Sequence, residues 1–160
     1  MRTDGVLKKA LAKSAGLSAA VATGKQAIKG EHRELLVEAD RTAARITDSL
    51  DLDVYRQDAA PSEHRWDYLV GVAGHAATCV VAVEVHPARE DQVTRMIEKA
   101  KAARRVLRAE CQADPVDGLW HWLASKNVDC SRAGSAERRL KEAGIAFPKT
   151  RLKIPGDLTR

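Results

Sequence analysis

The chain has 160 residues, of which 44% are hydrophobic and 31% charged, as expected for one globular domain with its own core. Only 4% of the residues are aromatic, which leaves little material for a base-stacking platform that binds single strands. No apolar run approaches the roughly 20 residues of a membrane span, and no secretory signal is apparent. We therefore expect a cytoplasmic protein without a membrane partner.

The cysteines and the charge pattern narrow the class of protein further. The chain has three cysteines and none of them shows a two-residue spacing, so the sequence predicts neither a disulfide framework nor a zinc knuckle. Residues 1–30 carry a charge of +5, residues 31–125 carry −5 and residues 126–160 carry +5. This layout suits an anionic polymer that is held at both ends around an acidic middle. A solvated surface of mixed charge is an equal alternative.

The N-terminal part of the chain is expected to contain a basic arm and then a helix. Residues 1–30 are predicted as an arm or weak helix outside a main domain of residues 31–160, because glycines interrupt the apolar pattern. Residues 31–50 are predicted as a helix, because five apolar residues recur at helical spacing: Leu35, Leu36, Ala39, Ala43 and Ile46. Residues 54–56 then follow as a short strand, before a loop over residues 58–62.

Two apolar runs in the middle of the chain are predicted to form a β-hairpin. Residues 65–72 and 78–86 have the composition of strands, and the residues between them are few and turn-like. A turn centred between the two runs would place Asp67 opposite Ala82. Glu84 would then lie one diagonal step away on the same face, at about 7 Å.

The second half of the chain is expected to complete a sheet. Pro87 is predicted to end the second hairpin strand, because proline cannot donate to the strand ladder. The later predicted elements are a helix over 89–110, a connector over 111–118, a core strand over 119–124, a helix over 135–143, and an edge strand over 145–154 that Pro148 interrupts. The sequence therefore predicts an α/β fold: one three-layer domain with a mixed central sheet, an αβββαβ-type core and helices on its faces.

Asp67, Glu84 and His86 are the candidate metal ligands. Glu84 lies in an otherwise apolar strand, where burial of an acid is costly unless the acid is paired or coordinated. Residues two apart on a strand share a face, so Glu84 and His86 are both expected to point toward Asp67. Two carboxylates with a nearby polar group suit Mg²⁺ or Mn²⁺. His86 could orient or deprotonate a water at such a site.

The order of elements and the placing of Asp67 and Glu84 resemble the PD-(D/E)xK, or restriction-endonuclease-like, nuclease superfamily. That family has an acid at the start of one strand and an acid-x-Lys on the next, and residues 31–125 match this order. The resemblance implies Mg-dependent hydrolysis of DNA phosphodiesters. It also places a further acid on a helix before the strands, with Glu38 as the first choice and Glu34 as the second. A homodimer is left open, because small nucleases often need two copies to cut two strands.

His86 is the main departure from the family, because it stands at the position of the family's lysine. Lys99 or Lys101 on the following helix could supply the missing cation. Alternatively, the chain keeps only the scaffold and binds nucleic acid or a protein partner, as a non-catalytic module of a bacterial defence or toxin-linked system. The structural alternatives to a metal site are a strand cap at Asp67 and an ion pair of Glu84 with Arg45, Arg65 or Lys99.

Basic residues on the helices predicted at 89–110 and 135–143 are the candidate DNA-binding set. They are Lys99, Lys101, Arg104, Arg105, Arg138 and Arg139. Such residues can follow a phosphate backbone, and a solvated basic face is the alternative.

Overall fold

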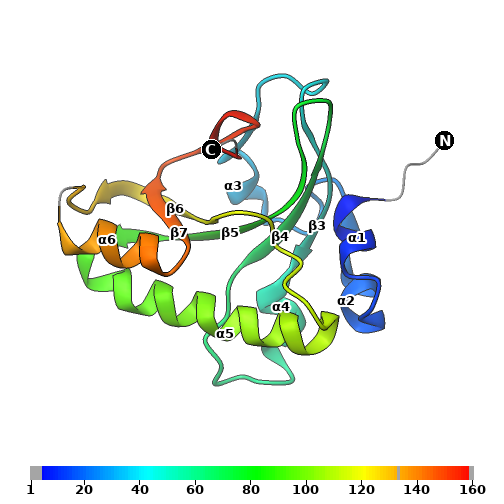
Figure 1. Ribbon diagram of the computed structural model, residues 1–160, viewed down its shortest axis with the longest axis horizontal. Helices are drawn as coiled ribbons and strands as arrows, with labels where there is room; N and C mark the ends of the chain where they lie inside the picture. The colour runs from blue at the N-terminus through cyan, green and yellow to red at the C-terminus, as the bar shows by residue number, and fades with distance from the viewer. Residues whose placement is uncertain (1–4, 133, 159–160) are drawn as a thin grey trace.

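The fold is built on one mixed six-stranded sheet with helices around it (Figure 1). The computed structural model describes residues 5–132 and 134–158. In spatial order the strands are β1 (Ala22–Thr23), β3 (Arg45–Asp51), β4 (Tyr68–Ala73), β5 (Thr78–Arg89), β6 (Trp120–Asp129) and β7 (Ile145–Lys149). Strands β1, β3, β4 and β5 pair antiparallel, whereas β5, β6 and β7 pair parallel. The predicted α/β class with a mixed central sheet is confirmed.

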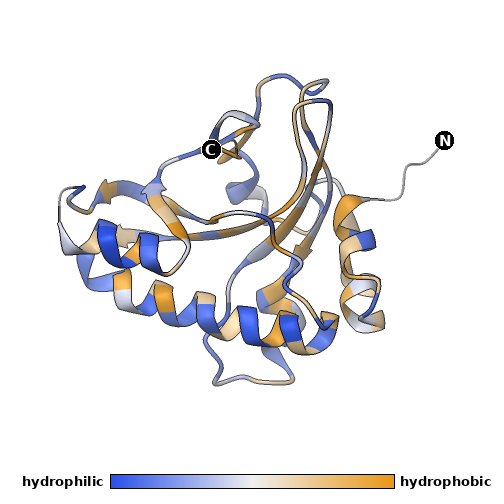
Figure 2. Ribbon diagram, viewed as in Figure 1, coloured by the Kyte–Doolittle hydropathy of each residue, from blue (hydrophilic) through white to orange (hydrophobic). Residues whose placement is uncertain are grey.

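One face of the sheet is covered by amphipathic helices. Helix α5 (Val93–Cys111) provides the crossover between the parallel strands β5 and β6, and the short turn η1 (Glu90–Gln92) leads into it. Helix α6 (Ser135–Glu142) connects β6 to β7. In Figure 2 the central strands are mainly orange, while the turns of α5 and α6 alternate between orange and blue. The apolar sides of both helices therefore pack on the sheet, as the sequence predicts for these two segments.

The opposite face is covered by a second, smaller sheet. Strands β2 (Leu36–Glu38) and β8 (Leu152–Ile154) pair in parallel, and the single-turn helix α3 (Gly30–Arg33) precedes them in the chain. Their buried side chains pack against the second face of β4 and β5. The third layer of the domain thus consists of a small β-ribbon and a short helix. The turn η2 (Gly156–Leu158) follows β8.

Residues 5–30 are part of the domain, which corrects the expected separate arm for its described part. Helices α1 (Val6–Ala10) and α2 (Ala15–Ala20) bury Leu7, Leu11 and Leu17 in the main core. Residues 1–4 lie outside the described chain. The glycines rule out one long helix here, but two short helices joined by a turn still bring the three leucines into the core.

The predicted helix over residues 31–50 is wrong. Its central part is a turn in which Asp40 Oδ1 accepts a hydrogen bond from the Thr42 backbone N–H at 3.0 Å, and such a local bond competes with a helix. The chain leaves this turn as β3, which pairs with β4. The predicted strand over residues 54–56 is also wrong. It lies in helix α4 (Leu52–Gln57), where Asp51 Oδ1 caps the helix by accepting from Val54 N–H at 2.9 Å.

The ends of the later strands also differ from the prediction. Strand β5 continues past Pro87 to Arg89, and its register against β6 shifts between His86 and Ala88. Proline is tolerated at such a bulge, because no ladder hydrogen bond is required from it. The predicted single edge strand is two strands in two sheets: β7, which includes Pro148, is the edge of the main sheet, and β8 pairs with β2. No helix in the described ranges combines the length and apolar character of a membrane crossing.

Candidate acid–lysine site

The β4–β5 hairpin brings Asp67 beside Glu84. Tyr68 pairs with Val83 and Leu69 pairs with Ala82, so Asp67, the residue before β4, meets the strand at Glu84. The predicted pairing of Asp67 with Ala82 is therefore wrong by two residues. A slip of two residues keeps every side chain on its face, because the side-chain period of a strand is two. The error thus leaves the predicted face correct and places the two acids closer together than the predicted diagonal.

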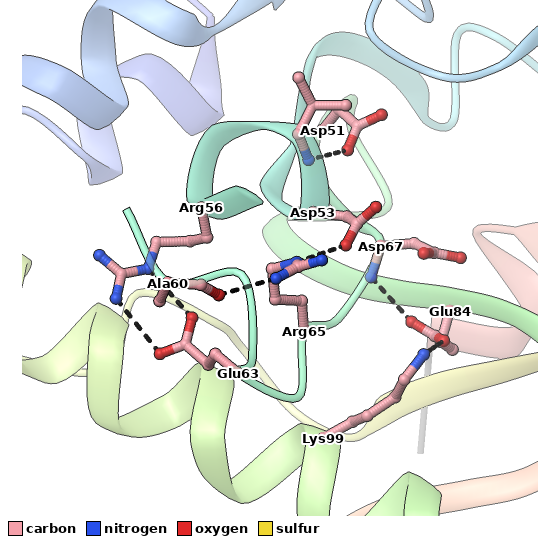
Figure 3. Close-up of polar contacts among 10 residues, drawn as sticks. Asp51, Asp53, Arg56, Ala60, Glu63, Arg65, Asp67, Glu84 and Lys99 are labelled. Atoms are coloured by element: carbon pink, nitrogen blue, oxygen red, sulfur yellow. Dashed lines mark hydrogen bonds and ion pairs between the residues drawn. The ribbon is translucent and has the colours of Figure 1, made fainter. Parts of the chain in front are cut away.

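Reciprocal hydrogen bonds fix the two acids, and Figure 3 shows the one between the Asp67 N–H and Glu84. The Asp67 N–H donates to Glu84 Oε2 at 2.8 Å, and the Val85 N–H donates to Asp67 Oδ2 at 3.1 Å. Each carboxylate therefore accepts from the backbone of the opposite strand segment. Both carboxylates are held in place before any ligand binds.

Glu84 is a buried acid in contact with a lysine. Its side chain is 1% exposed, and Lys99 Nζ, from helix α5, donates to Glu84 Oε1. Burial raises the pKa of Glu84 to about 8, with the charge of Asp67 acting in the same direction and Lys99 opposing both. The sequence analysis considered Lys99 in two roles: as a structural ion-pair partner of Glu84 and as the source of the missing cation. The structure contains the contact between Lys99 and Glu84.

Further acids approach Asp67 from helix α4, and the sequence prediction missed them. Leu52 N–H, in the first turn of α4, donates to the Asp67 carbonyl at 2.8 Å. This contact brings Asp51 and Asp53 near Asp67 (Figure 3). Burial is the main cause of the raised pKa values of Asp51 and Asp67, and Asp53 raises both further. The sequence did carry one signal for this helix: Asp51 directly precedes an apolar residue, and an Asp in that position commonly caps the start of a helix.

A histidine from the opposite layer also lies near Asp67. His32, on α3, has Nδ1 2.7 Å from Tyr68 Oη, and the Lys29 N–H donates to the same oxygen at 3.4 Å. The direction of the hydrogen bond between Tyr68 Oη and His32 Nδ1 depends on the tautomer of the imidazole. The charge of His32 lowers the pKa of Asp67. Nothing in the sequence pattern singled out His32, because its proximity depends on the packing of two distant segments.

His86 is not gathered with the two acids into a metal-binding group. Its Nε2 lies 2.8 Å from Gln92 Oε1, in η1. Burial lowers the pKa of His86, with Lys99 and Arg95 contributing, which favours the neutral ring. Within residues 5–132 and 134–158, no group of three or more His, Cys, Asp or Glu side chains has the geometry to hold a metal ion. The predicted three-ligand set of Asp67, Glu84 and His86 is thereby corrected.

Glu38 belongs to a different part of the molecule than predicted. It lies on β2 of the small sheet and not on a helix before the strands. Its Oε2 accepts from the Ile46 N–H at 2.9 Å, and Lys25 Nζ lies 3.3 Å from Oε1. Arg41 adds an ion pair at 3.7 Å. Glu38 therefore organises the turn before β3. The second choice, Glu34, is the C-terminal cap residue of α3 and is exposed.

The six predicted DNA-binding residues divide into two groups. Lys99 contacts Glu84, Arg104 donates to the Ala143 carbonyl at 2.7 Å and stacks on Trp120, and Arg139 donates to Thr94 Oγ1 at 2.7 Å. These three side chains have partners in the fold. The side chains without an ion pair or hydrogen bond to the described residues are Lys101, Arg105 and Arg138, and all three are exposed.

No protein-family model matches the chain, and neither a curated protein nor a solved structure matches it significantly. The chemistry of the site therefore follows from its geometry. A hard divalent cation takes one or two protein carboxylates together with water and phosphate oxygens. Asp67 and Glu84 offer such a pair: among the described residues, no hydrogen bond reaches Asp67 Oδ1, and burial together with the charge of Asp67 raises the pKa of Glu84, which a bound cation would oppose. The two residues are therefore the candidate ligands for one hard cation.

Proposed function

We propose that this chain is a metal-dependent nuclease-like domain that hydrolyses DNA phosphodiesters at Asp67 and Glu84. The observation that supports this most is the convergence of these two acids with Lys99. They come from two paired strands and the crossover helix, and reciprocal backbone hydrogen bonds hold the acids together. The lysine comes from α5 and not from the strand, so it supplies the positive charge that His86 cannot.

The residues have distinct roles in this proposal. Asp67 and Glu84 would hold Mg²⁺ or Mn²⁺, which lowers the pKa of a bound water and neutralises charge on the phosphate. Lys99 balances the charge of Glu84 and adds positive charge next to the reacting phosphate. His32, which is hydrogen-bonded to Tyr68 Oη, adds a polar group near Asp67. His86 stays neutral and can orient water.

Calorimetric titration with Mn²⁺ tests the proposal on the wild type, Asp67→Asn and Glu84→Gln. The wild type should bind one ion, and each substitution should weaken binding about tenfold or more, because it removes one of two anionic ligands. Asp58→Asn is the matched control, since Asp58 is an exposed acid at the end of α4. Nicking of supercoiled plasmid should require Mn²⁺ or Mg²⁺ and should be lost in both variants. Equal Mn²⁺ binding in all four proteins would remove the metal site.

One observation favours a second candidate, a non-catalytic module that binds nucleic acid or a protein partner. Glu84 is almost fully buried, and each of its oxygens already accepts a hydrogen bond, as in a structural ion pair. In that case the wild type would retain DNA binding but show neither Mn²⁺ binding nor nicking. Glu84→Gln would then change the stability of the fold and leave DNA affinity unchanged.

A further inference from the structure

A cavity of about 300 Å³ lies on the face of the main sheet opposite Glu84. Its walls come from β5, from the connector before β6, from β6 itself and from η2. Val81, Leu119 and Leu158 supply apolar surface, and Asp117, His121 and Asp157 supply polar groups. The volume is at the lower end of the range for sites that bind small molecules. Neither Asp67 nor Glu84 lines this cavity, so the inference is independent of the proposed nuclease function.

His121 is the unusual residue of the cavity. It is 5% exposed, and no hydrogen bond from any described residue reaches its ring. Burial, with the charge of Lys149, lowers its pKa to about 4, so the imidazole is neutral at physiological pH. Buried polar groups in native proteins nearly always have a partner. A neutral imidazole offers one donor and one acceptor to such a partner.

The two carboxylates at the cavity are fixed and make it rich in acceptors. Asp117 Oδ2 accepts from the Val80 N–H at 2.9 Å, which ties the connector to β5. Asp157 Oδ2 accepts from the Lys153 N–H at 2.7 Å, and its Oδ1 lies 3.4 Å from Lys149 Nζ. Negative groups beside apolar walls exclude phosphate and carboxylate ligands. They favour a ligand with an apolar plane and N–H donors on its edge.

We propose that this cavity binds an amino-substituted nitrogen heterocycle of nucleobase size. Its amino group donates to the aspartates, and its ring edge lies against His121. The apolar ring contacts Val81 and Leu119. A metal ion is a poorer occupant, because the cavity lacks a described group of three ligating side chains in metal-binding geometry.

Titration of the full chain with nucleosides, followed by NMR, tests this proposal. Adenosine and cytidine carry the amino group, whereas inosine and uridine carry an oxygen in its place. We expect saturable binding of the first pair and about tenfold weaker binding of the second, as for the loss of one hydrogen bond to a charged acceptor. Equal affinity for adenosine and inosine and for cytidine and uridine, or no binding at millimolar nucleoside, would overturn the proposal. So would displacement of the bound nucleoside by Zn²⁺ alone.

Two variants locate the binding. Leu119 is 41% exposed at the cavity, so Leu119→Lys should fold normally and weaken adenosine binding at least tenfold by occupying the space. Val54→Lys is the matched control, because Val54 is also an exposed apolar residue, at 58%, on α4 and outside the cavity. His121→Phe, checked for folding by circular dichroism, should weaken adenosine and inosine binding alike, because the aspartates recognise the amino group. Unchanged adenosine binding in Leu119→Lys would place the ligand elsewhere and refute the site.

Discussion

Glu84 is almost completely buried, and its neighbours have opposite effects on its pKa. Loss of water and the charge of Asp67 disfavour its ionised form, whereas Lys99 and the Asp67 N–H favour it. The raised pKa of about 8 means that the first two effects prevail in the absence of a ligand. Glu84 is therefore the residue at which a bound cation and a bound proton compete most directly.

Stability should consequently depend on pH through Glu84. The folded chain binds its proton up to a pKa of about 8, whereas the unfolded chain releases it near 4.5, so the Glu84 contribution to the free energy of unfolding falls as pH rises between these values. Glu84→Gln removes this contribution. Relative to the wild type, the variant should gain at least on the order of 1 kcal/mol between pH 5 and about pH 8, since one pKa unit corresponds to about 1.4 kcal/mol. Urea unfolding at both pH values measures the difference.

The contributions of the other titrating groups to the pH dependence of stability cancel when the wild type is compared with Glu84→Gln. His121 has a lowered pKa and stabilises the fold as pH rises toward 6.5, which opposes the Glu84 effect in the wild type but is common to both proteins. A constant stability difference between wild type and variant across this range would mean that Lys99 keeps Glu84 ionised throughout.

At the candidate site, the local sequence pattern predicted Asp67 and Glu84 but not the residues that approach them from other segments. Asp67 and Glu84 were found because a hairpin is a local structure and an acid in an apolar strand is costly to bury. His86 lies on the expected strand, but its partner Gln92 comes from the turn η1 after that strand. Residues such as His32 and Asp51 are brought to the site by tertiary packing, for which a single sequence carries little signal.

Helix α1 is attached to the sheet through a buried acid on β3. Asp48 is 3% exposed, and its carboxylate accepts from the Leu7 N–H at 3.0 Å and the Lys8 N–H at 2.9 Å. The contact is close because Gly71, on the neighbouring strand, has no side chain: a Cβ there would lie 2.1 Å from Asp48 Oδ1. Asp48 thus satisfies the N–H groups that open a short helix and joins the N-terminal segment to the domain.

Asp48→Asn should loosen this segment. The amide presents N–H groups to the helix N–H groups of Leu7 and Lys8, so at least one buried donor loses its partner, at a cost of about 1–3 kcal/mol. Urea unfolding should show this loss, and trypsin should cleave earlier at Lys8, Lys9 or Lys13. Asp58→Asn serves as the control on an exposed acid. Unchanged proteolysis of Asp48→Asn would mean that the buried leucines alone hold α1.

Elements with a strong period were predictable and those with competing local bonds were not. The hairpin strands and α5 follow from alternation and from an apolar stripe, because each presents one face to a large core. Residues 31–57 have apolar residues at spacings that suit either a helix or a strand. There, the side-chain bonds of Asp40 and Asp51 decide where the turn and α4 form. Such bonds depend on the rotamer of one side chain, so the periodicity of apolar residues does not predict them.

In the whole molecule, the basic helices α1 and α6 lie at opposite sides. Helices α1 and α2 lie on the right in Figure 1 and α6 lies on the left, with α4 and α5 between them. The candidate site at α4, β4 and β5 is therefore flanked by the basic segments, and its own region carries the negative charge. A duplex that crosses the site along α5 would meet phosphate-binding groups at both ends.

DNA affinity measured against salt concentration tests this arrangement. Each phosphate contact contributes about 0.9 to the slope of log K against log salt. Alanine at the three exposed residues Lys101, Arg105 and Arg138 should lower the slope by up to about 3, equally for unrelated sequences. Alanine at Lys9 and Lys13, on the opposite side, should lower it by up to about 2 if the duplex spans both ends.

The control for this measurement is a change of opposite sign on the same helix. Glu142 is an exposed acid at the end of α6, so Glu142→Gln should leave the slope unchanged or strengthen binding slightly. A loss of affinity in this variant would indicate damage to α6 and not a lost phosphate contact. If the slope stays unchanged in both sets of alanine variants, the basic ends form only a solvated surface. If it falls for the α5–α6 set alone, the duplex approaches the site from one side, because the α1 lysines then contact no phosphate.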